Sequence, residues 1–126
     1  MDSSGAPEQA SWWVVCLCAA WCGVCRDWQP TFSAQARANP HLRFAWVDVE
    51  DEDEAMGDVD IETFPTLMVA RGEEVLFLGP IPPSSTQFTR LLATLQAQPR
   101  PAPGTGAEAN GLFQRLKSGV LPQTVV

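Results

Sequence analysis

The sequence is poor in basic side chains and has no long apolar run. Eight lysines and arginines stand against fifteen aspartates and glutamates, which gives a formal net charge of −7. Such a charge argues against non-specific binding to nucleic acid or to an anionic membrane surface. No stretch reaches the roughly 18 consecutive apolar residues that a membrane-spanning helix needs. We therefore expect neither nucleic acid nor a membrane among the partners.

The segment ahead of the first apolar run also lacks positive charge. Residues 1–11 include Asp2 and Glu8 but no lysine or arginine, so the basic region that begins a secretory signal peptide is missing. The run that follows, at 12–20, is interpreted as a buried strand. The sequence thus predicts a flexible N-terminus at 1–11 and a cytoplasmic protein.

Histidine is scarce, and the acidic residues do not form a metal-binding motif. His41 is the single histidine, and its place beside Pro40 fits a turn residue better than a metal ligand. Nine of the fifteen carboxylates fall at 48–62, without the glycine and terminal glutamate of an EF-hand loop. This acidic segment is interpreted as a solvated helix start, with a docking surface for a basic partner as the alternative. No metal is expected.

Four cysteines lie within ten residues, and two of them form the motif Cys-Gly-Val-Cys at 22–25. After the first of these two, apolar residues recur at helical spacing, at Cys25, Trp28 and Phe32. Cys22 is therefore expected at or just before a helix N-terminus. Unpaired backbone N–H groups and the positive end of the helix dipole favour a thiolate there. Because a thiolate is the nucleophile of disulfide exchange, the pair is interpreted as a redox-active dithiol.

The cysteines also allow other interpretations. Tetrahedral zinc needs four sulfurs about 2.3 Å from one point. Cys16 and Cys18 lie within the expected strand whereas Cys22 lies beyond its end, which disfavours a four-sulfur site. A static disulfide, or two buried thiols, is the structural alternative for Cys22 and Cys25. Cys16 and Cys18 are interpreted as small buried hydrophobes, with a second redox site as the alternative.

Strand and helix patterns alternate along the rest of the chain. The expected elements are a strand at 12–20, a helix at about 23–38, a strand at 42–49, a short acidic helix at about 52–58, strands at 67–70 and 75–78, and a helix begun by a capping box at Ser84 and Gln87. This order predicts an α/β protein with a mixed four-stranded sheet flanked by helices.

A stretch rich in proline and glycine at 99–106 separates a domain at 12–98 from a tail at 99–126. The tail carries a weak helical stripe of apolar residues: Ala109, Leu112, Phe113 and Leu116. Two interpretations of the tail are open, namely that it is disordered or that its stripe docks on the domain or on a second subunit. The protein is accordingly expected to be a monomer or a tail-mediated dimer.

Taken in order, several features at about 12–97 resemble the thioredoxin family. A Trp-Cys-Gly-x-Cys motif follows a buried strand, and Phe-Pro-Thr at 64–66 matches the loop whose proline has a cis peptide and faces the dithiol. Pro30 lies where the family's proline kinks the active-site helix, and Gly79 falls near the glycine that closes its peptide groove. The resemblance implies a thioredoxin-like three-layer fold.

The resemblance also implies a thiol–disulfide oxidoreductase, in which Cys22 attacks a substrate disulfide and Cys25 resolves the mixed disulfide. The residues implied to shape a groove for an extended substrate strand are Trp21, Gly23, Val24, Phe64, Pro65 and Gly79. The implied partners are protein disulfides and a reductase or small thiol as electron donor, with no dissociable cofactor. Such a protein serves electron transport and cell redox homeostasis.

Three departures from the family pattern matter. The eleven residues before the first strand cannot supply the family's N-terminal strand and helix. Val24 stands where thioredoxin has proline. Because reduction potentials in the family range from about −270 to −120 mV, we expect this change to make the protein less reducing than thioredoxin. Cys16 and Trp46 stand where the family has a buried aspartate and a lysine, so Cys25 is expected to resolve more slowly. These departures leave a binding or assembly module with little redox turnover as the alternative function.

Overall fold

The computed structural model of the protein describes residues 11–19, 21–57, 59, 61, 63–101, 106–119 and 121. Along this part of the chain the elements are β1 (Trp12–Cys18), α1 (Gly23–Ala38), β2 (Arg43–Asp48), α2 (Asp53–Met56), β3 (Thr66–Arg71), β4 (Glu74–Pro80), α3 (Ser85–Ala97) and α4 (Ala107–Gly119). The predicted order is confirmed, and the tail contributes a helix. Nearly all of the predicted flexible N-terminus at 1–11, and the middle of the predicted linker at 102–105, lie outside the described residues.

The strands form one mixed four-stranded sheet, as predicted, in the order β2-β1-β3-β4. β1 pairs in parallel with β2 and antiparallel with β3, and β3 pairs antiparallel with β4. A parallel pair needs a crossover connection, which α1 supplies between β1 and β2. A tight turn joins β3 to β4, with Gly72 at a φ of 62° that suits glycine.

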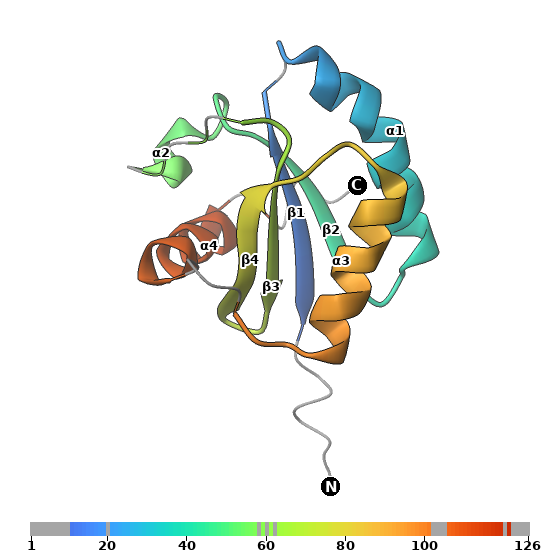
Figure 1. Cartoon of the computed structure of the whole chain (residues 1–126). Coiled ribbons are helices and arrows are strands. Elements are labelled where there is room, and N and C mark those ends of the chain that lie inside the picture. The colour runs from blue at the N-terminus through green and yellow to red at the C-terminus, as the bar shows by residue number, and fades with distance from the viewer. Residues whose placement is uncertain are drawn as a thin grey trace, which may run out of the picture.

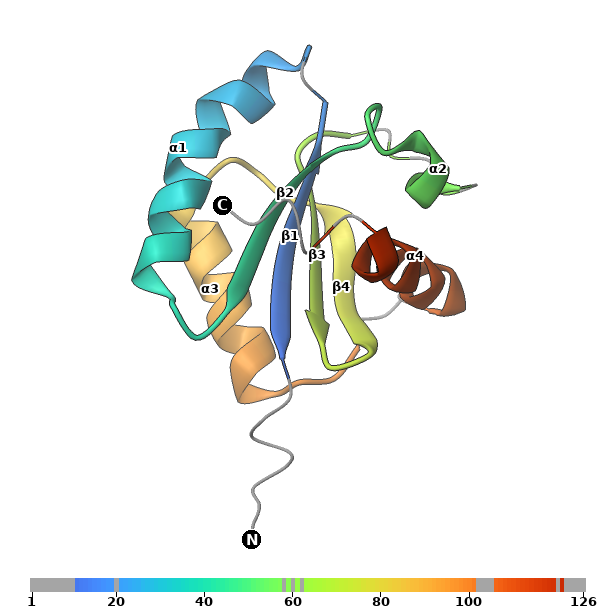
Figure 2. The ribbon, with the colours of Figure 1, turned by 180° about the vertical axis from the view of Figure 1, so that it is seen from behind.

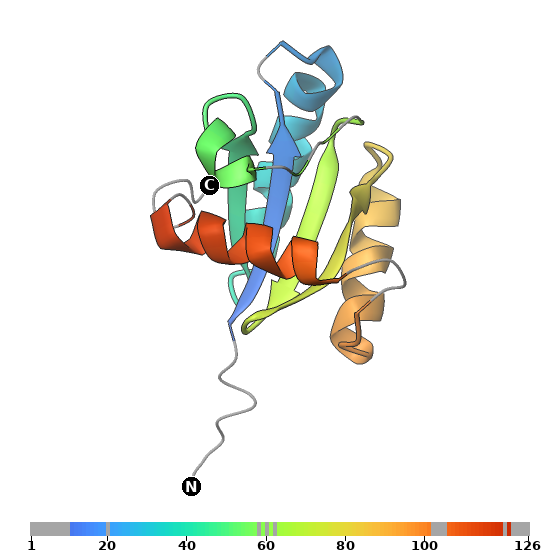
Figure 3. The ribbon, with the colours of Figure 1, turned by 90° about the vertical axis from the view of Figure 1, so that its left-hand side faces the viewer.

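Helices cover both faces of this sheet. α1 and α3 lie against one face, and α2 and α4 lie on the other, as Figure 1 and the reverse view in Figure 2 show. α4 crosses its face of the sheet in front of the strands in Figure 3. The arrangement is therefore three layers, helix, sheet and helix. In the described ranges, no helix is both long and apolar enough to span a membrane.

β1 contributes side chains to two separate hydrophobic cores. Successive side chains of a strand point to opposite faces, so Val15 and Leu17 enter the core beside α4. Val14, Cys16 and Cys18 enter the core beside α1 and α3. Every residue of β1 after Trp12 is buried, which explains why the strand appears in the sequence as an unbroken apolar run.

α2 is shorter than the helix predicted at about 52–58. It ends at Gly57, whose φ of 60° lies outside the right-handed helical region and suits glycine. The guanidinium of Arg115, on α4, donates to the carbonyl oxygens of Ala55 at 2.7 Å and Met56 at 3.2 Å. α4 thus supplies donors to carbonyls at the end of α2, where the Met56 carbonyl also accepts from the Val59 N–H at 3.1 Å.

α4 docks on the sheet through its apolar stripe. Its buried residues are the four that the sequence predicts: Ala109, Leu112, Phe113 and Leu116. Polar contacts flank them, because the Val75 N–H donates to the Asn110 side chain at 2.8 Å and Lys117 forms an ion pair with Glu73 at 2.8 Å. Of the two interpretations of the tail, docking on the domain is confirmed for 107–119.

We expect Phe113→Ala to lower the free energy of unfolding by about 3 to 5 kcal/mol, because removing a fully buried ring leaves a cavity. Ser118→Ala, on the exposed side of the same helix, is the control, with an expected change within about 0.5 kcal/mol. Urea unfolding followed by circular dichroism measures both variants. Equal unfolding midpoints for Phe113→Ala and the wild type would show that α4 does not stabilise the fold.

Candidate active site

The chain turns from strand to helix around Cys22. The Cys22 N–H donates to the Ala19 carbonyl at 3.0 Å, and the Cys22 carbonyl accepts from the Arg26 N–H at 3.2 Å. Cys22 is therefore the N-cap residue of α1, and its side chain makes no capping hydrogen bond. The thiol is free and half-buried. The predicted position of Cys22 at the helix N-terminus is confirmed.

Cys25, three residues further on, is bonded to Cys18 and not to Cys22. The disulfide joins the last residue of β1 to the third residue of α1, across a Cα–Cα distance of 6.0 Å. Both cysteines are only 1% exposed. The pairing of Cys22 with Cys25 as a working dithiol stays a prediction.

The interpretation of Cys18 as an unpaired buried hydrophobe is wrong. Alternation along β1 directs Cys18 to the face that α1 covers, and Cys25 belongs to the buried side of α1 together with Trp28 and Phe32. The two sulfurs therefore meet in one core. Both signals are present in the sequence, but combining them requires knowing which face of the sheet α1 covers.

Cys16 is fully buried, as the sequence predicts, and stays a free thiol. Burial raises its pKa to about 12, partly offset by the indole N–H of Trp28, although that contact falls short of hydrogen-bond geometry. The Cys16 sulfur lies 3.6 Å from the Cys18 sulfur. Because a disulfide sulfur carries no hydrogen, the Cys16 S–H is the donor in this contact.

The exposed surface beside Cys22 is apolar. Trp21 is 62% exposed and Val24 is 46% exposed, while Gly23 is the exposed first residue of α1. The Trp21 ring meets the Phe64 ring edge to face, with centroids 5.7 Å apart. The structure thus brings Trp21 and Phe64 together, although they lie far apart in the sequence.

Sequence reasoning missed Glu50 as part of this surface. The indole N–H of Trp21 donates to the Glu50 carboxylate at 2.9 Å. Glu50 follows the end of β2, and the Asp48 carboxylate accepts its backbone N–H at 2.9 Å. The carboxyl ends of parallel neighbours such as β1 and β2 meet at one edge of a sheet, which is the signal that could have placed Glu50 beside the motif.

The remaining predicted residues lie at the facing ends of β3 and β4. The Phe64–Pro65 peptide is cis, as the resemblance implies, and the Pro65 carbonyl accepts from the Ile81 N–H at 3.2 Å. Gly79 pairs with Leu67 in the hairpin.

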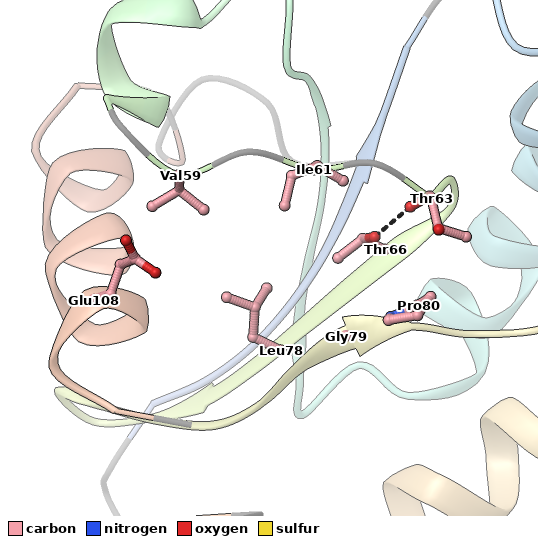
Figure 4. Close-up of a pocket in the computed structure, with 8 residues that line it drawn as sticks. All are labelled: Val59, Ile61, Thr63, Thr66, Leu78, Gly79, Pro80 and Glu108. Carbon is pink, nitrogen blue, oxygen red and sulfur yellow. Dashed lines mark hydrogen bonds between the residues drawn. The ribbon is translucent and has the colours of Figure 1, made fainter. Parts of the chain in front are cut away.

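Gly79 also lines a pocket of about 340 Å³ between the 59–66 segment, β4 and α4 (Figure 4). The residues that line it are Val59, Ile61, Thr63, Thr66, Leu78, Gly79, Pro80 and Glu108. Within it the Thr66 hydroxyl donates to the Thr63 carbonyl. The pocket's described lining includes neither a cysteine nor Trp21. The place of Gly79 in a substrate groove stays a prediction.

The two positions that depart from the family pattern are neighbours in the sheet. Cys16 on β1 is in register with Trp46 on β2, and the Trp46 ring packs against Phe32 with centroids 5.7 Å apart. Neither position carries a charge, so neither offers Cys25 a base. Among the described residues, no group of three or more histidine, cysteine or acidic side chains is arranged to hold a metal ion.

A mixed sheet between two helical layers, with a cysteine at the turn from the first strand into its helix, defines a thioredoxin-like protein. A model of the family described as Thioredoxin matches residues 6–80. The chain belongs to the thioredoxin family. The predicted thioredoxin-like fold class is thereby confirmed.

Similar proteins carry thioredoxin names. The Streptomyces coelicolor protein called thioredoxin 2 is 39% identical over 62 residues, which cover 49% of this chain and 46% of that protein. An H-type thioredoxin of Fagopyrum esculentum is 35% identical over 63 residues, which cover 49% of this chain and 54% of that protein. The chain thus spans about half the length of the curated relatives it matches. The X-ray structure of Fasciola hepatica thioredoxin is 26% identical with a TM-score of 0.61, and the match covers 67% of this chain and 80% of that one.

Because Cys16 is buried, we expect the folded protein to lose stability at alkaline pH. Folding raises the Cys16 pKa from its ordinary value of 9.0 to about 12, so the folded state holds the proton more tightly than the unfolded state. The resulting stabilisation is complete below about pH 9 and is lost as the pH rises towards about 12. The expected loss is roughly 1 kcal/mol per pH unit within this window.

Urea unfolding at stepped pH between about 9 and 11 tests this dependence. Few other groups titrate there, because the sequence has no tyrosine and a single lysine, Lys117. Cys16→Ala should remove most of the decline, whereas the control Cys22→Ala, at a half-buried site, should keep it. The same slope in Cys16→Ala and the wild type would contradict the assignment to Cys16.

Proposed function

We propose that the protein is a thiol–disulfide oxidoreductase that exchanges protein disulfides, with Cys22 as the attacking residue. The observation that supports this proposal is the accessibility of the Cys22 sulfur. Cys22 is free and half-buried, whereas each of the other three cysteines is at most 1% exposed. Cys22 is therefore the sulfur that a disulfide of another protein reaches. Membership of the thioredoxin family supports the same chemistry.

The proposed reaction begins with Cys22 as a thiolate and Cys25 reduced. The Cys22 sulfur attacks one sulfur of the substrate disulfide, a mixed disulfide forms, and the other substrate sulfur leaves as a thiolate. Cys25 then attacks the Cys22 sulfur, which releases the second substrate sulfur and forms a Cys22–Cys25 disulfide. Two electrons pass from the dithiol to the substrate, and a reductase or small thiol returns them.

The apolar surface beside Cys22 supports docking of an extended substrate segment. The exposed ring of Trp21 and the half-buried ring of Phe64 provide a large contact area at little entropic cost. The proposed groove keeps the six residues predicted from the sequence: Trp21, Gly23, Val24, Phe64, Pro65 and Gly79. Gly79 also lines the pocket beside α4.

The setting of this activity is part of the same proposal. We infer a cytoplasmic protein that takes part in electron transport and cell redox homeostasis, with protein disulfides as substrates. The net charge of −7 supports exclusion of nucleic acid and anionic membranes from its partners. Docking of α4 on its own sheet supports a monomer, since the stripe proposed for a tail-mediated dimer is already buried.

Reduction of insulin disulfides by the full chain, with dithiothreitol as electron donor, tests the activity. We expect Cys22→Ser to lose the rate above the dithiothreitol background, because serine is not a nucleophile towards disulfides. Cys16→Ser, which changes a fully buried cysteine of the same strand–helix unit, should retain the rate and serves as the matched control.

A binding or assembly module is the second candidate function. The Cys18–Cys25 bond favours it, because that bond withdraws the predicted resolving thiol from Cys22. Wild-type protein that reduces insulin no faster than Cys22→Ser would reject the oxidoreductase and leave this module.

A further inference from the structure

Cys25 lies within reach of two different sulfur partners. It is bonded to Cys18 across a Cα–Cα distance of 6.0 Å, inside the range of about 4.4 to 6.8 Å that disulfides span. It is also the third residue of α1, whose N-cap is Cys22, and the side chain of an N-cap residue reaches the third residue of its helix. The hydrogen bond from the Cys22 N–H to the Ala19 carbonyl folds the chain back beside the end of β1.

We propose that Cys18 is a third redox-active residue, which accepts the disulfide from Cys22–Cys25 and thereby restores Cys22 as a free thiol. The proposal rests on the proposed function, since it places Cys18 after Cys25 in the same exchange. It assigns a chemical role to a cysteine outside the Cys-x-x-Cys motif. It also accounts for a protein in which the buried sulfurs of Cys18 and Cys25 are oxidised while the accessible sulfur of Cys22 is not.

The proposed step is a disulfide exchange within the chain. The Cys18 thiolate attacks the Cys25 sulfur of the Cys22–Cys25 disulfide, so that the Cys18–Cys25 bond forms and the Cys22–Cys25 bond breaks. Cys22 leaves with the electron pair as a thiolate, and the proton released from Cys18 passes to solvent. The number of disulfides in the protein stays constant, so the substrate disulfide is the sole oxidant consumed.

Burial explains why Cys18 is expected to react through Cys25 and not directly with a substrate. Cys18 and Cys25 are each 1% exposed and share a core, so an external disulfide does not reach Cys18. A buried thiolate is costly unless a donor faces it. The S–H of Cys16, whose sulfur lies 3.6 Å from that of Cys18, is such a donor and stays protonated at neutral pH.

The first test maps the disulfide in the full-length chain. Reduced protein is oxidised with one equivalent of diamide, quenched in acid and denatured, and its free thiols are alkylated with N-ethylmaleimide. After reduction, the newly released thiols are alkylated with iodoacetamide. Tandem mass spectrometry then assigns the two labels on the peptide that ends at Arg26, which contains all four cysteines.

The proposal expects the iodoacetamide label on Cys18 and Cys25, with N-ethylmaleimide on Cys16 and Cys22. Iodoacetamide on Cys22 and Cys25, with Cys18 carrying N-ethylmaleimide, would overturn it. This result depends on the wild-type chain alone, so it holds even where a variant fails to fold.

The second test uses Cys18→Ser, with Cys18→Ala as a second variant and Cys16→Ser as the matched control on the same strand face. In Cys18→Ser the iodoacetamide label should move to Cys22 and Cys25, and a brief maleimide pulse on the native oxidised protein should no longer label Cys22. Cys16→Ser, which keeps a donor beside Cys18, should show the wild-type pattern. Persistent labelling of Cys22 in folded, oxidised Cys18→Ser would contradict the relay. Circular dichroism verifies folding.

The insulin assay separates failure of the relay from failure of the proposed function. Insulin reduction that depends on Cys22, together with a Cys22–Cys25 disulfide in the oxidised wild type, rejects the role of Cys18 and keeps the oxidoreductase. Absence of insulin reduction rejects the oxidoreductase, and with it the relay, whatever disulfide the mapping finds.

Discussion

The central position of β1 is the constraint on which the rest of the structure depends. It lies between β2 and β3, and helices cover both faces of the sheet. Its side chains, which alternate between the two faces, must therefore pack into two different cores. One set of residues packs under α4 and the other packs under α1 and α3. The same alternation places Cys16 and Cys18 on the α1 side, where Cys25 meets them. A shift of β1 by one residue would exchange the two sets and remove the cysteines from α1.

α4 completes the fold from the C-terminal side of the chain. Its stripe fills the core beside Val15 and Leu17, and its polar residues bind the elements around it. Arg115 holds the end of α2 through backbone carbonyls, and Asn110 accepts from the backbone of β4. A helix with a weak apolar stripe is therefore held by contacts to three other parts of the fold. Glu108 of α4 also lines the pocket that contains Gly79.

Periodicity along the chain was enough to predict the element order, the mixed sheet and the N-cap position of Cys22, because each depends on neighbouring residues. The partner of Cys25 was not predictable in this way. It depends on the rotation of α1 about its own axis over β1, which packing of Trp28 and Phe32 against α3 and β2 fixes. The contact between Trp21 and Glu50 likewise depends on two strands meeting at one edge. The surface on which α4 docks was not predictable for the same reason, since an apolar stripe does not specify the surface that it covers.

The division of the core has a consequence for the order in which the protein acquires its structure during synthesis. Within the part of the chain that the structure describes, the side built from α1 and α3 draws its buried residues from positions before 96. The other side includes Leu112, Phe113 and Leu116, so it stays incomplete until α4 has left the ribosome. Before α4 is synthesised, the nascent chain therefore already holds the described residues of one core, its cysteines included, but lacks part of the other core. Cysteine chemistry is thus possible on a ribosome-bound chain before the fold is closed.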